Sequence, residues 1–168
     1  FKLYSRELSA ECLKLVTGLT NMTAAEMDRV SQGMIDGCSN YTGDKNIEQY
    51  CNDCTESIDE HINEIVSVKN KSSDFSMIST MLAGNLSADQ ISANIKLAIS
   101  GGQNEPRDAI AGCIWAALNF GLKEQLLEKD NWEQLFNEYC RWMSPIGMSP
   151  REIAKDFVYK NVTFKKGD

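Results

Sequence analysis

The chain has 168 residues, a hydrophobic share of 42%, a charged share of 24% and a formal net charge of -7. This length corresponds to one domain with a substantial core, and the acidic excess excludes a protein whose main partner is a nucleic-acid backbone. The longest uncharged apolar run, 109–120, falls well short of the roughly 20 residues that a membrane span requires. The start of the chain is too charged for a signal peptide, so the composition predicts a cytoplasmic protein without a membrane partner.

The first half of the chain predicts helices. Apolar residues recur at helical spacing over about 3–17, 46–68 and 75–82. Thr23 and Glu26 have the spacing of a capping box, in which each side chain satisfies a free N–H of the first turn, and they begin a predicted helix over 23–37. These segments alternate with polar turns, as in a helical bundle.

The second half contains the most unusual segment, a helical pattern over 87–120 that begins with the capping box of Ser87 and Gln90. Gly101, Gly102 and Pro106 interrupt this pattern, and inside a helix each glycine costs roughly 1 kcal/mol and a proline about 3 kcal/mol. Either the helix stops at residue 100 or one long helix is distorted. We predict one distorted helix over 87–120, followed by helices over 123–129 and 132–143.

The C-terminal tail carries two conflicting signals. Residues 149–152 have the pattern of a further capping box, whereas 157–164 are rich in β-forming residues with a turn at Lys160 and Asn161. We predict extended structure over about 150–165. The expected fold class is therefore mainly α, a single bundle around a long distorted central helix with a small C-terminal β hairpin.

Three signals follow one another in a fixed order: the glycine pair of the distorted helix, the Glu138-x-x-Arg141 motif and Arg151 before the β tail. This order resembles the cytochrome P450 family of haem-thiolate monooxygenases, and its bacterial branch in particular. The resemblance extends over nearly the whole chain. It implies that the first helix is similar to the family's E helix, that 23–37 and 46–68 are similar to the F and G helices of the substrate lid, and that 87–120 is similar to the I helix, which crosses the haem.

The resemblance assigns the distorted helix to catalysis. Gly101 and Gly102 would form the groove where dioxygen meets iron. Asn104 and Glu105 stand where the family has an acid and a threonine that deliver protons. Because both residues depart from the family pattern, the standard proton relay is in doubt. Glu105 either carries protons itself or braces the distorted helix against Arg107.

The resemblance also assigns residues after this helix. Glu138 and Arg141 would form the buried ion-pair network that stabilises the haem-side core, although an i,i+3 pair of this kind also occurs on helix surfaces. Arg151 would bind a haem propionate, because a guanidinium fits a carboxylate with two hydrogen bonds. The substrate pocket would be lined by four residues, namely Ile99, Ile146, Gly147 and Met148.

The family's axial cysteine loop, of the type Phe-x-x-Gly-x-x-x-Cys, is missing from the sequence. None of the six cysteines fits that loop, since we expect each to lie in a helix or in the turn just after one. Both ends of the chain resemble cut ends. We therefore expect a fragment that binds haem weakly or not at all, from a protein that hydroxylates a small organic substrate with electrons from a ferredoxin-type partner.

A fragment exposes apolar faces that the rest of the protein would bury. We expect such a face along the stripe of Ile110, Ile114, Trp115 and Leu118. We therefore expect a homo-oligomer that buries this stripe, with exchange of helices between identical chains as one route.

Two other functional classes remain open. One is a non-catalytic helical binding or oligomerisation domain, which the single histidine favours. The other is a di-metal carboxylate bundle, suggested by Asp59, Glu60, His61 and Glu64 but lacking paired Glu-x-x-His motifs. The lone Cys51-x-x-Cys54 predicts neither zinc binding nor redox chemistry, because it has no second pair and no βαβ setting.

Overall fold

The structure is a computed structural model that describes residues 2–69, 71, 74–129, 131–144, 146–147 and 151–168. Its elements in chain order are α1 (Lys2–Thr17), α2 (Ala24–Cys38), α3 (Lys45–Lys69), α4 (Met77–Ala83), α5 (Ala88–Gly102), α6 (Asn104–Asn119), α7 (Lys123–Lys129), α8 (Trp132–Met143), β1 (Phe157–Tyr159) and β2 (Val162–Phe164). The prediction of a mainly α fold with a C-terminal hairpin is confirmed.

The helix starts follow their capping residues. Both predicted capping boxes are present, at Thr23 with Glu26 and at Ser87 with Gln90. The helix predicted over 75–82 begins later, because the Ser76 hydroxyl accepts a hydrogen bond from the backbone N–H of Ser79 and so caps α4.

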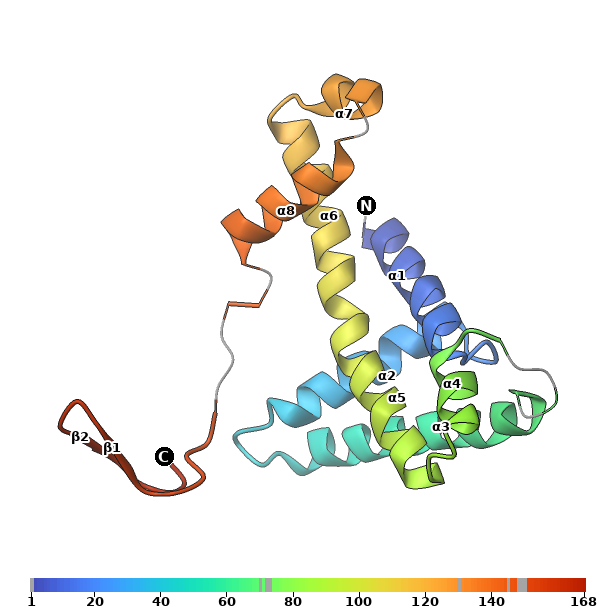
Figure 1. Cartoon of the computed structure of the whole chain (residues 1–168), viewed down its shortest axis with the longest axis vertical. Coiled ribbons are helices and arrows are strands. Elements are labelled where there is room, and N and C mark those ends of the chain that lie inside the picture. Colours follow the sequence, from blue (N-terminus) through green and yellow to red (C-terminus); the bar gives the residue numbers. More distant parts are fainter. Residues whose placement is uncertain (1, 70, 72–73, 130, 145, 148–150) are drawn as a thin grey trace.

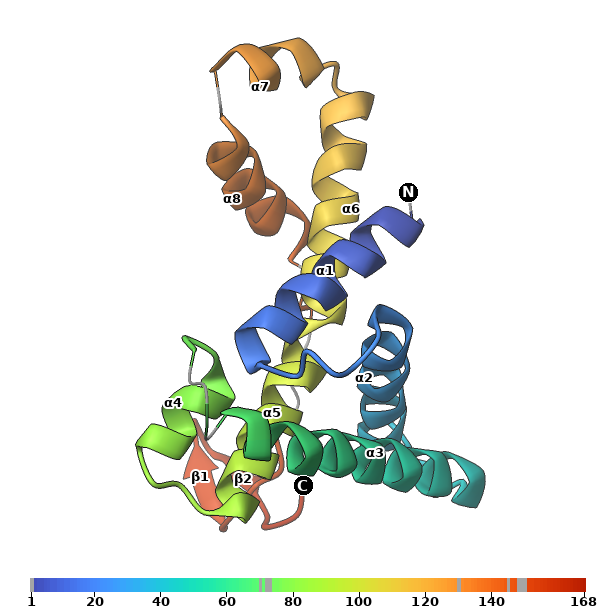
Figure 2. The same ribbon diagram turned by 90° about the vertical axis from the view of Figure 1, so that its right-hand side faces the viewer.

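The core lies where α1 to α5 meet, and α6 to α8 extend away from it (Figures 1 and 2). Its central side chains are fully buried and come from separate helices, including Met27 and Val30 of α2, Ile58 of α3, Ile78 of α4 and Ile95 of α5. Figure 1 shows α5 and α6 following one another in a single column beside α1, so they act as the central support of the fold.

The hairpin β1–β2 is antiparallel, with Phe157 opposite Phe164 and Tyr159 opposite Val162. Lys160 and Asn161 both have positive φ, at 48° and 65°, as a tight two-residue hairpin turn requires. The predicted turn is therefore confirmed, but the extended region was placed too early. Residues 151–156 form neither strand nor helix, because the pairing that stabilises a strand begins at Phe157.

Candidate functional site

The central helix is interrupted at Gln103, the single residue between α5 and α6. In a continuous helix the N–H of residue 106 would donate to the carbonyl of Gly102, but Pro106 has no N–H and its ring would collide with that carbonyl. The interruption places Pro106 in the first turn of α6, where a missing donor is tolerated. The alternative of a helix that stops at residue 100 is wrong, since α5 continues through Gly102.

Neighbouring helices satisfy the backbone at this interruption. The Ser9 hydroxyl of α1 donates to the Gln103 carbonyl at 2.9 Å, and the Ser31 hydroxyl of α2 donates to the Ile99 carbonyl at 3.3 Å. The fully buried Gln103 amide donates to the Arg6 carbonyl and to Asp28, each at 3.4 Å. The distortion is thus held by contacts to two other helices.

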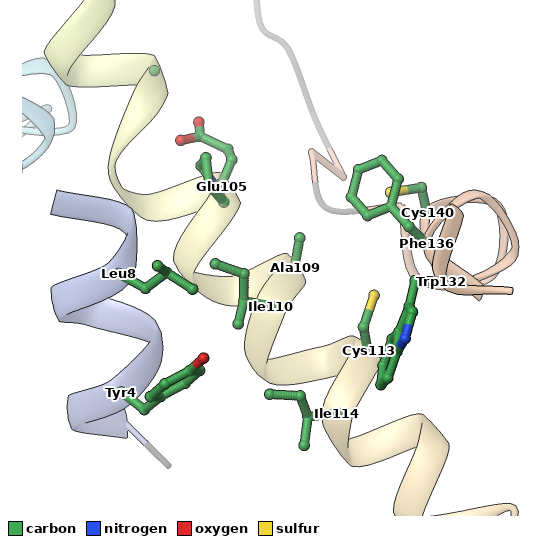
Figure 3. Close-up of a pocket in the computed structure, with 12 residues that line it drawn as sticks. Tyr4, Leu8, Glu105, Ala109, Ile110, Cys113, Ile114, Trp132, Phe136 and Cys140 are labelled. Atoms are coloured by element: carbon green, nitrogen blue, oxygen red, sulfur yellow. The ribbon is translucent and has the colours of Figure 1, made fainter. Parts of the chain in front are cut away.

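A cavity of about 620 Å³ lies beside the interruption, between α1, α6 and α8 (Figure 3). Its lining is apolar and partly aromatic: Tyr4, Leu8, Gly101, Glu105, Pro106, Ala109, Ile110, Cys113, Ile114, Trp132, Phe136 and Cys140. Figure 3 shows Tyr4 and Leu8 of α1 on one side of α6, with Trp132 and Phe136 of α8 on the other. The volume falls within the range of small-molecule pockets, roughly 300–1,000 Å³.

Glu105 is the one residue with a formal charge among the described residues that line this cavity. Its Oε2 atom is buried and has no hydrogen-bond partner in the described structure, and the same is true of Oδ1 of Asn104. Arg107 does not pair with Glu105, because its guanidinium lies 3.7 Å from Asp28 and 2.9 Å from Asp108. The suggestion that Glu105 braces the helix against Arg107 is therefore wrong.

Two thiols also line the cavity, Cys113 from α6 and Cys140 from α8. Burial, and to a smaller extent the neighbouring Cys140, raises the pKa of the Cys113 thiol. The cavity therefore offers a protonated thiol at this position near neutral pH, which is a weaker nucleophile and metal ligand than a thiolate.

Comparison with solved structures finds a similar arrangement of helices in P450 proteins, of which two are described below. The structure of P450BioI in complex with acyl carrier protein ligated to hexadec-9Z-enoic acid matches with a TM-score of 0.81 at 17% identity, over 98% of this chain and 44% of that one. CalO2 matches with a TM-score of 0.70 at 13% identity, over 98% of this chain and 43% of that one. The fold is P450-like. The chain spans less than half the length of either protein, and no protein-family model matches it.

Within this P450-like fold, the predicted catalytic residues of the central helix lie close together but only two of them reach the cavity. Gly101 and Glu105 line it. Gly102 instead faces α1, where a Cβ would lie 2.9 Å from Cδ1 of Leu13, and Asn104 lies outside the lining. Successive positions of a helix are rotated by about 100°, which turns Gly102 toward α1 while Gly101 borders the cavity.

The predicted substrate-pocket residues lie elsewhere. Ile99 is fully buried in the core and does not line the cavity. Ile146 and Gly147 are exposed on the segment after α8, and Met148 is outside the described residues. Their role as a pocket stays a prediction.

Glu138 and Arg141 form an ion pair, with the guanidinium donating to the carboxylate at 2.6 and 2.7 Å. The side chains are 62% and 69% exposed. The pair is therefore exposed in this structure, and its place in a buried network of a whole protein stays a prediction.

Arg151 lies on the exposed segment before the hairpin and does not line the cavity. The other cavity residues were missed by sequence reasoning, although Trp132, Phe136 and Cys140 recur at i, i+4 and i+8 on α8. That spacing predicts that the three residues share one face of α8, but it does not predict which helix packs opposite that face.

The cavity residues by themselves do not fit a haem. No Lys or Arg is among the described lining residues, so the lining has no cation to pair with a propionate. The buried thiol of Cys113 is held protonated, whereas axial ligation requires a thiolate.

The competing metal site is not formed. In the part of the chain that the structure describes, no three His, Cys, Asp or Glu side chains gather to hold a metal ion. Asp59 instead accepts hydrogen bonds from Ser92 and Lys96, at 2.5 and 2.6 Å. Among the described residues, each helix is also too short or too polar to cross a bilayer.

Proposed function

We propose that this chain is part of a haem-dependent P450 monooxygenase, a protein that inserts one oxygen atom from O2 into a small organic substrate. The observation that carries the proposal is the interruption at Gln103, which follows Gly101 and Gly102 in the central helix of a P450-like fold and borders an apolar cavity. Because the chain spans 44% of P450BioI, the haem-ligating loop would belong to further sequence of the whole protein.

The roles of individual residues follow from this proposal. Gly101 would leave room beside the helix, since a Cβ there would meet no atom within 4 Å. Glu105 would hold a proton at the cavity wall, with Asn104 next to it, while Arg151 would bind a propionate. Ile146, Gly147 and Met148 would contact substrate, and a ferredoxin-type protein would supply electrons to a cytoplasmic enzyme.

The experiment is to extend the sequence from its source, express the whole protein and record its reduced spectrum under carbon monoxide. We expect a Phe-x-x-Gly-x-x-x-Cys loop in the added sequence and the absorption band of a thiolate-ligated haem. A whole protein without that loop or band would contradict the proposal. The present chain reconstituted with haem is the control, and we expect no stoichiometric haem band from it.

A non-catalytic helical assembly domain is the second candidate. It is favoured by an exposed aromatic cluster in which Trp115 stacks on Trp142, with ring centroids 6.2 Å apart and an angle of 10° between planes. Phe120 packs edge-on against both rings. A whole protein that self-associates and shows no haem band would support this second function instead.

A further inference from the structure

The cavity between α1, α6 and α8 combines apolar walls with one acidic group at its end. Tyr4, Trp132 and Phe136 supply aromatic surface, and Ile110 and Ile114 supply aliphatic surface. Figure 3 shows the Glu105 carboxylate at the opposite end of the labelled lining from Trp132 and Ile114. A ligand that matches these walls has an apolar body and one polar end.

Unpaired acceptors lie in the chain segment at the polar end of the cavity, and one of them belongs to the cavity lining. Three consecutive residues, Gln103, Asn104 and Glu105, each have a buried side-chain oxygen without a hydrogen-bond partner among the described residues. Buried polar atoms in folded proteins are nearly always paired, so unpaired ones indicate a missing partner. All three atoms are acceptors, and the missing partner must therefore be a donor.

The nearest cation of the same helix does not supply that donor. Arg107 is held by Asp28 and Asp108, with its guanidinium 3.7 and 2.9 Å from their carboxylates. Gln103 is fully buried and directs its amide N–H groups to Arg6 and Asp28. Only Glu105 of the three acceptor residues lines the cavity, so it is the group that a ligand in the cavity would meet.

We propose that this cavity binds an apolar amine, with the ammonium group on the Glu105 carboxylate and the hydrocarbon or aromatic part between α1 and α8. An ammonium carries three donors and no acceptor, which matches the one unpaired acceptor of the lining, Oε2 of Glu105. A hydrogen bond between two charged groups is about twice as strong as a neutral one, and Trp132 and Phe136 would pack against the apolar part. The inference rests on the proposed function for its substrate class: the enzyme's substrate would be a cationic amine with an apolar body.

The experiment uses the present chain without haem and isothermal titration calorimetry. The probes are phenylbutylamine, phenylbutanol and phenylbutyrate, which share one apolar body and differ in the charge of the end group. We expect the amine to bind about tenfold more tightly than the alcohol, and the acid to bind most weakly. Equal affinity for amine and alcohol, or no binding of the amine, would overturn the proposal.

Two variants and a control locate the binding site. Glu105→Gln should reduce the affinity for the amine to that for the alcohol. Asp53→Asn removes the same charge from an exposed position of α3 outside the cavity lining and should leave amine binding unchanged. Gly101→Leu should weaken binding of the amine and the alcohol, because its side chain would extend from the cavity wall and its Cβ would meet no atom within 4 Å. Unchanged amine binding in Gly101→Leu would place the site elsewhere and overturn the proposal.

Circular dichroism of each variant checks the fold. If Glu105→Gln does not fold, the amine and alcohol affinities of the unmodified chain still decide the proposal. The outcome is also separable from that of the proposed function, which depends on the haem band of the whole protein. If the chain prefers the amine but the whole protein shows no haem band, the monooxygenase proposal is contradicted and the amine site is supported. If the whole protein shows the haem band but the chain does not prefer the amine, only the proposal of an amine site is contradicted.

Discussion

At the scale of single residues, Asp74 connects the end of α3 to the start of α4. Its carboxylate pairs with the buried Lys69 ammonium of α3 and accepts hydrogen bonds from the Ser76 N–H at 3.0 Å and the Ser79 hydroxyl at 2.8 Å. The Lys69 contact, followed by those of Ser76 and Ser79, holds the pKa of this carboxyl well below its usual range. The ionised form of Asp74 therefore stabilises the folded state.

We expect the contribution of Asp74 to stability to disappear in acid. A carboxyl whose pKa is lower when folded contributes fully above its unfolded pKa, about 3.9, and loses that contribution as the pH falls toward the folded pKa. Asp74→Asn should therefore lower the free energy of unfolding at neutral pH, and its difference from the unmodified chain should shrink below about pH 4. Urea denaturation at several pH values measures this difference. Lys69→Gln removes the largest cause of the lowered Asp74 pKa. It should therefore also make the free energy of unfolding depend less on pH in acid. If the stability difference between Asp74→Asn and the unmodified chain does not change with pH, this explanation is contradicted.

At the scale of elements, α2 and α3 cross closely because glycines of α2 meet cysteines of α3. A Cβ on Gly33 would collide with the thiol of Cys54, and a Cβ on Gly37 would collide with the thiol of Cys51. The Cys-x-x-Cys spacing thus places two small side chains over two glycines four residues apart. This packing explains the motif without metal or redox chemistry.

Gly33→Ala should destabilise the chain by about 1–3 kcal/mol, because the added methyl overpacks the contact with Cys54. Urea denaturation followed by circular dichroism measures the loss. The matched control is Gly101→Ala, also a helical glycine, where a Cβ would meet nothing within 4 Å. That change should leave stability unchanged or raise it by up to about 1 kcal/mol, since alanine favours a helix. Similar losses in both variants would argue against a close helix crossing.

At the scale of the whole molecule, α6 and α8 leave apolar side chains uncovered. The described part of α8 has no buried residue, and Trp115, Leu118 and Trp142 are 48%, 59% and 51% exposed. The stripe predicted on α6 is divided by the structure, because Ile110 and Ile114 line the cavity while Trp115 and Leu118 face outward. An exposed apolar patch of this kind favours association.

We expect the chain to self-associate through this face. Sedimentation velocity at increasing concentration should show dimers or larger species, and Leu118→Lys should shift the population toward monomer by placing a charge in the contact. Leu97→Lys, at a 71% exposed position of α5, is the matched control and should not change association. A chain that stays monomeric at all concentrations would contradict this expectation.

Local signals in the sequence determined the features that depend on near neighbours along the chain. Thr23 with Glu26 and Ser87 with Gln90 predicted helix starts, because a capping box involves only four consecutive residues. The glycine pair and Pro106 predicted a distorted central helix for the same reason, since proline affects the carbonyl four residues before it.

Only the tertiary structure decided which of these residues share a site. The cavity brings Tyr4 of α1 together with Glu105 and with Phe136 of α8, across more than half of the chain, and no local pattern encodes that meeting. It also decided that Ile99 is buried in the core and that the Glu138–Arg141 pair is exposed. The physical reason is that burial and hydrogen-bond satisfaction depend on which helices pack against each other, whereas capping and helix interruption depend on the backbone within a single turn.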